Sequence, residues 1–587
     1  MLKKWKIKEA ANPDFFNQFK EYPRVILQLL WNRDLKNKEA IEKFLNPQLS
    51  DLFSPDLMLN MKKGAKRITQ AIENNERMAI YGDYDTDGIC AAVILAQGFK
   101  RFGFENFDVF IPNRFRGGYG LTIERLEEIA KDGVKLVISV DCGITDVEEV
   151  NFAKKLGLEI LIFDHHLPHS VLPDALLVDP HQLKDDYPFK YLVATAISYK
   201  LTQVLAELLD FPFKQSLEKQ FLDLVAIATI ADVAPLLNEN RVLVKFGLEE
   251  LKDSSNLGLK ALLKVAGISD YKKFTTTHVG FVIAPRLNAV GRVEHLTEAG
   301  RLEHTDYSFE LLMTENENEA KMWAERTDEF NIERQKQVQE IYSAISEKIQ
   351  KQGGPERVIF FGDPLWSQGV LGVVAGKLKD EWHRPVFLYS QGEEVSLGSS
   401  RSINGFNLVE IMDKGRQLLI ECGGHSEAAG FSIRNENLEK FHQFLEEQAA
   451  LVLKEEDLTP TLEIETILEP EEINPQFLEF FYKLEPFGKG NPEPLFLMEQ
   501  VKLERLRPVG KNGNHLKLTI SKNRRKFDVI SFNSVEKLKH LNQGMNIDLV
   551  FILRENEWQG QKYLDFELVD TKEIKNEKLK NYEKANR

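Results

Sequence analysis

The chain has 587 residues, 43% of them hydrophobic, and carries a formal net charge of −15. That length predicts several domains of the usual ~100–200 residues. The three cysteines share no metal-ligand spacing and cannot all pair, which excludes a disulfide framework and fits a reducing cytosol. No apolar run approaches the ~18–20 residues that span a bilayer, and no signal peptide is visible. We therefore expect a cytoplasmic protein that does not enter the membrane.

The acidic charge, with a pI near 5.5, argues against nucleic-acid binding when it is considered alone. Two facts weaken that argument. Carboxylates that bind cations still count as negative in the sum, and the distribution of charge matters more than its total. Residues 502–526 contain a local excess of Lys and Arg, which favours a nucleic-acid-binding segment there.

Residues 1–55 are predicted to form a small N-terminal adaptor with helical patches. Residues 56–210 follow as the first large domain, in which short apolar runs alternate with segments of helical spacing. This alternation is typical of βαβ units and a parallel sheet.

Three aspartates at every second position follow the first apolar run of that domain. The run, residues 78–80, is expected to be a short buried strand, and Asp83, Asp85 and Asp87 come directly after it. Carboxylates crowded in this way repel one another unless a cation lies among them. Because open α/β sheets bind ligands at the carboxyl ends of their strands, the motif predicts a metal site.

Two further strand-like runs end in residues of the same kind. The first ends at Asp141 and the second at Asp164-His165-His166, with helical spacing between them. A fourth acid, Asp232, closes the apolar run 224–231. A charge buried beside such a run needs a partner or a metal.

Other interpretations of these motifs stay open. The first also matches the start of an EF-hand loop, but the bidentate Glu that such a loop needs at its twelfth position is Ile94 here. Solvated turn carboxylates are a second alternative, which leaves the ligand-type residues at three strand ends unexplained. Asp164 is either a metal ligand or a residue that orients a neighbouring histidine.

The rest of the chain divides into four parts. Residues 211–355 are predicted to be helical and to end in one or two long charged helices, with a coiled coil as the alternative. Residues 356–453 have the pattern of a second α/β domain. Residues 455–572 are strand-rich and suggest either an OB-like barrel or a barrel used only for packing. Residues 573–587 form a charged tail.

The Asp-x-Asp-x-Asp-Gly and Asp-His-His motifs together resemble the DHH phosphoesterase superfamily. The segment 82–88 is similar to the RecJ exonuclease version, whereas the family II pyrophosphatase type has a leading His. The resemblance spans about residues 50 to 570, and further RecJ-like stretches follow in order at 111–114, 284–289, 399–402 and 423–425. It implies an α/β fold with a DHH-type parallel-sheet domain, a long connecting helix, a DHH-associated α/β domain and a C-terminal OB-like β-barrel.

The resemblance also implies a two-metal phosphodiester hydrolase, in which two divalent cations generate the nucleophile and absorb phosphoryl charge. Carboxylates with one imidazole suit Mn²⁺ or Mg²⁺. The implied metal ligands are Asp83, Asp85, Asp87, Asp141, His165 and Asp232. Asp85 and Asp87 are expected to hold different metals, with Asp141 bridging them and Asp83 at the first metal or in its outer shell. The catalytic residues are expected to be Asp141 and His166, the latter as a phosphate contact or general acid.

Separate groups are expected to hold the substrate. Arg114 and Arg401 are predicted to clamp a terminal 5′-phosphate, and the pair Gly423-Gly424 permits close approach of the backbone. The predicted substrate-binding residues are Arg114, Arg286, Asn288, Arg292, Ser399, Arg401, Gly423, Gly424 and His425.

The implied function is that of a single-stranded-DNA-specific 5′→3′ exonuclease that releases 5′-mononucleotides in recombination and repair. Its expected partners are single-stranded DNA, a helicase and a single-strand-binding protein. One alternative is a small-substrate DHH phosphatase acting on pyrophosphate or short oligonucleotides, although those relatives lack the C-terminal barrel. Another is a replication scaffold that has lost its metals, although every candidate ligand is present.

Overall fold

The computed structural model describes residues 3–112, 120–212, 219–293, 307–510, 512–558 and 561–574. The chain forms two units. The first contains residues 48–459 and 488–490, and the second joins residues 2–47 with 460–487 and the chain from 491 onward. No helix in the described ranges is long and apolar enough to cross a membrane.

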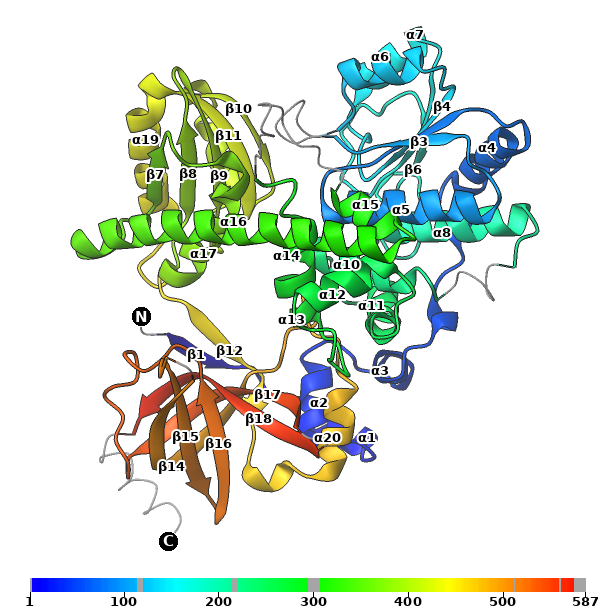
Figure 1. Cartoon of the computed structure of the whole chain (residues 1–587). Helices are drawn as coiled ribbons and strands as arrows, with labels where there is room; N and C mark the ends of the chain where they lie inside the picture. The colour runs from blue at the N-terminus through cyan, green and yellow to red at the C-terminus, as the bar shows by residue number, and fades with distance from the viewer. Residues whose placement is uncertain are drawn as a thin grey trace. The chain divides into compact units, whose positions relative to one another are not determined.

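A parallel five-stranded sheet in the order β3-β2-β4-β5-β6 opens the first unit (Figure 1). Its strands are β2 (Met78–Tyr81), β3 (Phe107–Phe110), β4 (Leu136–Val140), β5 (Glu159–Phe163) and β6 (Leu176–Val178). Every residue of β2 and β4 is buried, as expected for a parallel sheet that helices cover on both faces.

Alternate residues of these strands enter two different hydrophobic cores. Met78 and Ile80 pack with α4 (Met61–Glu73), α5 (Thr86–Arg101) and α8 (Ala194–Leu208) on one face. Ala79 and Tyr81 pack with α6 (Ile123–Lys131) and α7 (Val147–Lys155) on the other. The strand and helix ranges agree with the βαβ pattern predicted from the sequence.

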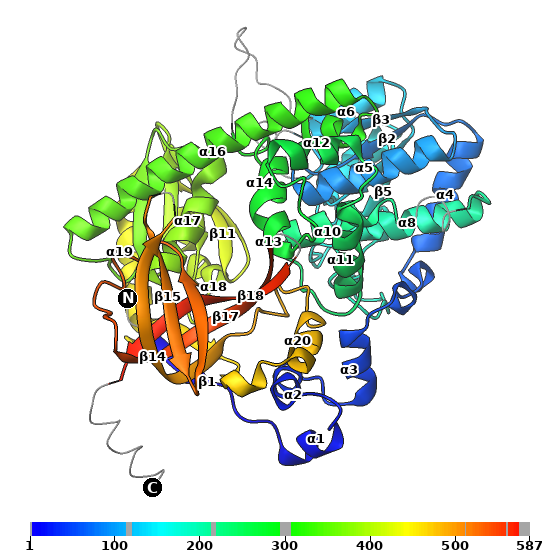
Figure 2. The ribbon, with the colours of Figure 1, turned by 60° about the horizontal axis from the view of Figure 1, so that its bottom comes forward.

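A helical region follows the sheet. It contains α10 (Leu222–Ala231), α11 (Asn238–Leu251), α12 (Leu257–Val265), α13 (Thr276–His278), the π-helix η3 (Val279–Ile283), α14 (Ala284–Leu287), α15 (Tyr307–Met313) and α16 (Glu317–Lys351). The predicted long charged segment is the single 35-residue helix α16, which starts at the cap Asn316. Figure 2 shows α16 running beside α12, α14 and α17.

The second sheet of this unit is mixed, in the order β10-β11-β9-β8-β7. Its strands are β7 (Ile359–Asp363), β8 (Val386–Gln391), β9 (Val395–Arg401), β10 (Leu419–Gly424) and β11 (Ala428–Arg434), and its helices are α17 (Gln368–Trp382), α18 (Leu408–Lys414) and α19 (Leu438–Val452). The pairing of β7 with β8 is parallel, and the others are antiparallel. Helices α17 and α19 contribute to two separate cores.

The second unit is a closed barrel together with the N-terminal helices. The barrel strands are β14 (Phe496–Val509), β15 (His515–Lys522), β16 (Arg525–Ser531), β17 (Asn546–Trp558) and β18 (Gln561–Glu573), and the pairing of β14 with β17 closes them. Around them lie β1 (Lys4–Ile7), α1 (Pro13–Gln18), α2 (Arg24–Trp31), α3 (Lys38–Leu45), β12 (Thr461–Ile464), β13 (Thr466–Ile467) and α20 (Pro475–Tyr482).

One hydrophobic core joins the N-terminal helices to the barrel. It contains Ile26 and Leu30 of α2 together with Phe496 and Phe551 of the barrel, all fully buried. Strand β1 also pairs in parallel with β12. The N-terminal residues, predicted as an adaptor, therefore fold with a partner that lies more than four hundred residues later in the chain.

A buried ion pair joins α8 and α11 in the first unit. The ammonium group of Lys200 lies 2.8 Å from Glu239 Oε1 and donates to the carbonyl oxygen of Phe53 at 2.8 Å. The other oxygen of Glu239 accepts a hydrogen bond from the Tyr187 hydroxyl at 2.6 Å. Because both charges are buried, each depends on these partners for its solvation.

Candidate metal centre

Asp85 is the N-cap of α5, the helix that follows strand β2. Its Oδ1 accepts hydrogen bonds from the backbone N–H groups of Asp87 (2.9 Å) and Gly88 (3.1 Å). A side chain at position 88 would place its Cβ 2.5 Å from the backbone nitrogen of Asp83. The Asp-x-Asp-x-Asp-Gly motif is thus a tight strand-to-helix connection that needs glycine at its end.

Asp87, in the first turn of α5, is held by the N-terminus of α8. Its two carboxylate oxygens accept the backbone N–H groups of Ala194 (2.8 Å) and Thr195 (2.9 Å). A helix N-terminus favours negative charge. Burial raises the pKa of Asp87, whereas the nearby His165 lowers it.

Asp141 lies at the exit of β4, next to β2 in the sheet. It is 2% exposed, and its φ of 64° is in the left-handed region, which Asp tolerates better than most residues. Burial raises the pKa of Asp141 well above its usual value, and the charges of Asp87, Asp85 and Asp83 raise it further. His165 Nε2 lies 3.1 Å from Asp141 Oδ1 and 3.6 Å from Asp87 Oδ2.

Two sets of ligand-type atoms meet at Asp141. One comprises Asp83, Asp85 and Asp141, the other Asp141, His165 and His166, and the atoms of each set lie within 4.8 Å of one another. A carboxylate common to two such sets is what a pair of bridged divalent cations needs. Oxygen donors with imidazole fit Mn²⁺ or Mg²⁺, so the residues present fit the implied metals.

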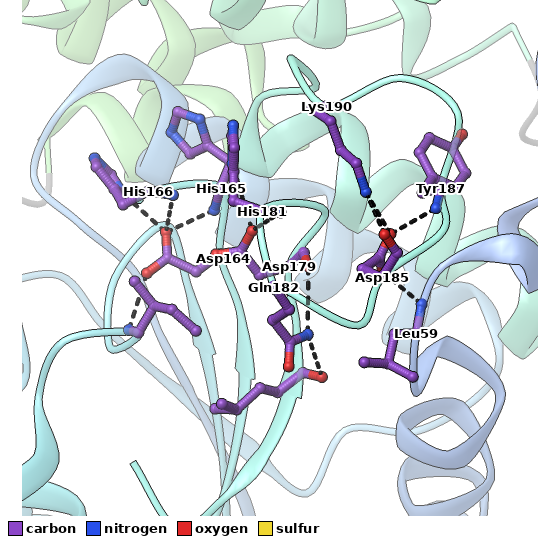
Figure 3. A network of polar contacts seen from close by, with 12 residues as sticks. Leu59, Asp164, His165, His166, Asp179, His181, Gln182, Asp185, Tyr187 and Lys190 are labelled. Carbon is purple, nitrogen blue, oxygen red and sulfur yellow. Dashed lines mark hydrogen bonds and ion pairs between the residues drawn. The ribbon is translucent and has the colours of Figure 1, made fainter. Parts of the chain in front are cut away.

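Asp164 is fully buried, and Figure 3 shows its contacts with the neighbouring residues. Its Oδ1 accepts the N–H of His165 (2.7 Å) and lies 2.8 Å from His166 Nδ1, and its Oδ2 accepts the N–H of Ile144 (3.1 Å). This is the geometry of a carboxylate that orients an imidazole. Burial opposes the ionisation of both groups, but their hydrogen bond holds the pKa of Asp164 at about 2 and that of His166 at about 9.

Asp232 is the C-cap of α10, where part of the residue stays exposed to solvent. Desolvation of its carboxyl group raises the pKa of Asp232, and the charges of Asp87 and Asp85 raise it further. The charges of the other acids therefore reach Asp232, but Asp232 belongs to neither set of ligand-type atoms found at Asp141 among the described residues. Its role as a metal ligand stays a prediction.

The predicted substrate residues nearest the acids have contacts within the protein. Asn288 Oδ1 accepts the backbone N–H of Thr86 at 2.9 Å, so this side chain braces the start of α5. Arg286 Nε donates to Asp328 Oδ1 at 2.8 Å. Arg292 lies in the turn that follows α14, and Arg114 lies outside the described residues.

The other predicted substrate residues are on the second sheet. Arg401, on β9, donates to the carbonyl oxygen of Ser400 at 2.8 Å and lies 3.4 Å from Ser399 Oγ. Gly424 has a φ of 139°, and a Cβ there would lie 2.5 Å from the carbonyl oxygen of Ala428, so the β10–β11 turn requires glycine. A Cβ at Gly423 would meet no atom within 4 Å. His425 is exposed, and its backbone N–H donates a hydrogen bond to the carbonyl oxygen of Ala428.

Two features near the metal centre were not found from the sequence. The backbone N–H groups of Ala194 and Thr195 carry no side-chain signal and reach Asp87 only through the tertiary fold. Asp179, which directly follows β6, did carry a signal, because it ends the apolar run of residues 176–178. That is the pattern by which Asp141 and Asp164 were recognised.

Comparison with known proteins first defines the class. The model of the DHH family, N-terminal domain, matches residues 77–229, that of the DHHA1 domain matches 355–451, and that of the RecJ OB domain matches 464–570. With the acidic and histidine cluster at the carboxyl edge of the first sheet, these matches define a DHH-type phosphoesterase.

The relatives then define the family. The chain is 37% identical over 542 residues to the single-stranded-DNA-specific exonuclease RecJ of Bacillus subtilis, a match that covers 92% of this chain and 66% of that protein. It is 32% identical to RecJ of Haemophilus influenzae, with 90% and 93% covered. The crystal structure of Thermus thermophilus RecJ in complex with Mn²⁺ superposes with a TM-score of 0.81 at 28% identity, covering 97% of this chain and 80% of that one. The chain belongs to the RecJ family.

Proposed function

We propose that this chain is a single-stranded-DNA-specific exonuclease that hydrolyses DNA in the 5′→3′ direction and releases 5′-mononucleotides. The observation that carries the proposal is the pair of ligand sets that share the buried Asp141. Similarity to RecJ across the DHH, DHHA1 and OB segments supports the choice of substrate.

The acidic residues and His165 would hold two divalent cations. Asp83, Asp85 and Asp141 would hold one cation, and Asp141 with His165 the other, with Asp87 and Asp232 as the further acids at the site. Bound Mn²⁺ or Mg²⁺ supplies a hydroxide nucleophile and offsets the charge on the phosphoryl oxygens.

His166 belongs to the second set of ligand-type atoms, but its role in this proposal is to contact the substrate rather than to hold a cation. Its Nδ1 faces Asp164 at 2.8 Å, which fixes the orientation of the ring and turns Nε2 away from that carboxylate. A histidine held in this way donates a hydrogen bond to phosphate or a proton to the leaving oxygen.

Substrate binding is proposed for the groups predicted from the sequence. Arg401, Ser399 and the open side of Gly423 would receive a terminal 5′-phosphate, and the barrel would bind the following strand through its basic residues.

We also propose a cytoplasmic location, a role in recombination and repair, and a helicase and a single-strand-binding protein as partners. The domain limits 1–55, 56–210, 211–355, 356–453, 455–572 and 573–587 belong to the same proposal.

The direct test is Mn²⁺-dependent digestion of a single-stranded DNA labelled at either end, beside the same sequence as a duplex. The expected products are mononucleotides released from the 5′ end of the single strand only. Hydrolysis restricted to pyrophosphate or very short oligonucleotides would instead support the small-substrate phosphatase. The Asp141→Asn variant is the matched negative control, since a contaminating nuclease would be unaffected by it.

A further inference from the structure

A second Asp-x-His sequence lies at the strand exit next to Asp164. Strand β6 ends at Val178 and is followed by Asp179, Pro180 and His181. The parallel register pairs Phe163 of β5 with Val178, and the N–H of Asp164 donates to the Val178 carbonyl oxygen at 3.1 Å. Asp164 and Asp179 are therefore equivalent positions on neighbouring strands.

The two pairs have a similar arrangement (Figure 3), but only His166 Nδ1 is hydrogen-bonded to its carboxylate, whereas His181 Nδ1 has no hydrogen-bond partner among the described residues. Asp179 Oδ1 accepts the backbone N–H of His181 at 2.6 Å and lies 3.5 Å from His181 Nδ1. Asp164 Oδ1 accepts the backbone N–H of His166 at 3.2 Å and lies 2.8 Å from His166 Nδ1. In both pairs a fully buried carboxylate faces the Nδ1 side of a histidine two residues later.

A turn alone does not account for a charged residue at this position. The turn needs only Oδ1, and an asparagine would accept the same backbone hydrogen bond without a buried charge. Asp179 Oδ2 is buried and accepts no hydrogen bond from the described residues. The neighbouring Gln182 amide instead donates to the carbonyl oxygens of Leu177 and Asp179. A buried carboxylate oxygen that accepts no hydrogen bond is unfavourable. The turn therefore does not explain why residue 179 is an aspartate rather than an asparagine.

We propose that His181 contacts a phosphate of the single-stranded DNA beside the metal centre, and that Asp179 is the positioning residue that orients its imidazole. This inference rests on the proposed function. His181 is not part of either ligand set at Asp141 among the described residues, which separates it from the metal ligands. With Nδ1 turned to Asp179 and 19% of the side chain exposed, Nε2 is the atom available to the substrate.

The test compares His181→Ala, His181→Gln and Asp179→Asn in the full chain, measuring kcat, KM for single-stranded DNA and the Mn²⁺ concentration at half-maximal activity. Removal of one charge-assisted hydrogen bond predicts that His181→Ala raises KM roughly 10–100-fold, with kcat and the Mn²⁺ requirement little changed. His181→Gln, which keeps a donor, restores part of the affinity, and Asp179→Asn gives a smaller rise in KM. His169→Ala, at an exposed histidine of the preceding loop, is the matched control and leaves KM unchanged.

Two results would overturn the inference. An unchanged KM in His181→Ala, with thermal stability equal to wild type, means that the histidine does not reach the substrate. A higher Mn²⁺ requirement with a loss in kcat means that it acts on the metals instead. The wild-type protein in the same assay distinguishes failure of this inference from failure of the proposed function. A wild type that does not digest single strands would refute the proposed function itself.

Discussion

Replacing Asp141 by Asn is predicted to stabilise the metal-free protein while abolishing its activity. Asparagine keeps the size of the side chain and tolerates the left-handed backbone at this position. It removes the one charge that belongs to both ligand sets. The same substitution therefore acts in opposite directions on the metal-free and the metal-bound states.

The magnitude follows from the spacing of the acids. Two carboxylates whose oxygens lie within 4.8 Å repel each other by roughly 3 kcal/mol at an effective dielectric constant of about 20. His165, at 3.1 Å, offsets part of that repulsion, and partial protonation of Asp141 offsets more. We expect the metal-free Asp141→Asn protein to gain about 1–3 kcal/mol. Activity should fall by roughly 10³-fold or more, since metal ions contribute several kcal/mol to such a transition state and each ~1.4 kcal/mol is a factor of ten.

The titration of Asp141 is expected to make the stability of the metal-free protein fall as the pH rises. The pKa of Asp141 is raised in the folded state above its ordinary value of 3.8, so the contribution of Asp141 to the stability of the metal-free fold is greatest below that pH. Stability is lost as the pH rises through the folded-state pKa, because the folded protein then has to ionise a buried, crowded carboxyl group. The Asn variant should show a shallower loss of stability with rising pH.

Thermal unfolding in EDTA and in Mn²⁺, with activity measured in parallel, tests this reasoning. Wild type should gain stability with Mn²⁺, and Asp141→Asn should start higher and respond little. Asp223→Asn is the matched control, since Asp223 is also buried, has a pKa raised to about 6 by burial, and bonds Ser254 rather than the cluster. A metal-free Asp141→Asn protein that is less stable than wild type, or that retains activity within tenfold, would refute the argument.

Three further predictions concern the fold and the substrate residues. Lys200→Met should lower stability by about 3–5 kcal/mol because Glu239 is left as an unpaired buried charge, and adding Glu239→Gln should restore part of the loss in denaturant unfolding. Asn288→Ala should lower kcat with little change in KM, because the side chain braces Thr86; steady-state kinetics showing mainly a higher KM would instead favour direct substrate contact. Arg505 and Arg507 are both exposed on β14, and replacing both by Ala should weaken the binding of long single strands. The slope of log K against log salt concentration should become shallower by ~0.7 for each phosphate that the variant no longer neutralises. An unchanged slope in titrations at several salt concentrations would mean that these residues contact no phosphate.

Local patterns were sufficient to predict the strand exits of the first sheet. The apolar runs before Asp83, Asp141 and Asp164 are short, continuous and buried on both faces, which is the pattern that a parallel sheet imposes. Parallel strands in one sheet bring their carboxyl ends to one edge, so the closeness of these acids followed from their positions in the chain. The long helix α16 was predictable for a similar reason, since its charged sequence lacks Gly and Pro over 35 residues.

Contacts between distant segments were not predictable in this way. Nothing in residues 13–45 indicates that α1, α2 and α3 share a core with a barrel formed by the last part of the chain. Asn288 was predicted to bind substrate, yet its amide oxygen accepts a hydrogen bond from the backbone N–H of Thr86, 202 residues away. Such pairings depend on the packing of whole elements, which a single sequence does not display.

The support of Asp87 shows why this limit matters for the metal centre. A crowded group of carboxylates is unfavourable before metals bind, and the repulsion would push apart any acid on a mobile loop. Asp87 resists this because two backbone N–H groups at the start of α8 bind both its oxygens, and the Thr195 hydroxyl donates to its carbonyl oxygen. The ligands supply the chemistry, but a helix that begins 107 residues later keeps them in place, so the geometry of the centre is a property of the folded domain rather than of its motifs.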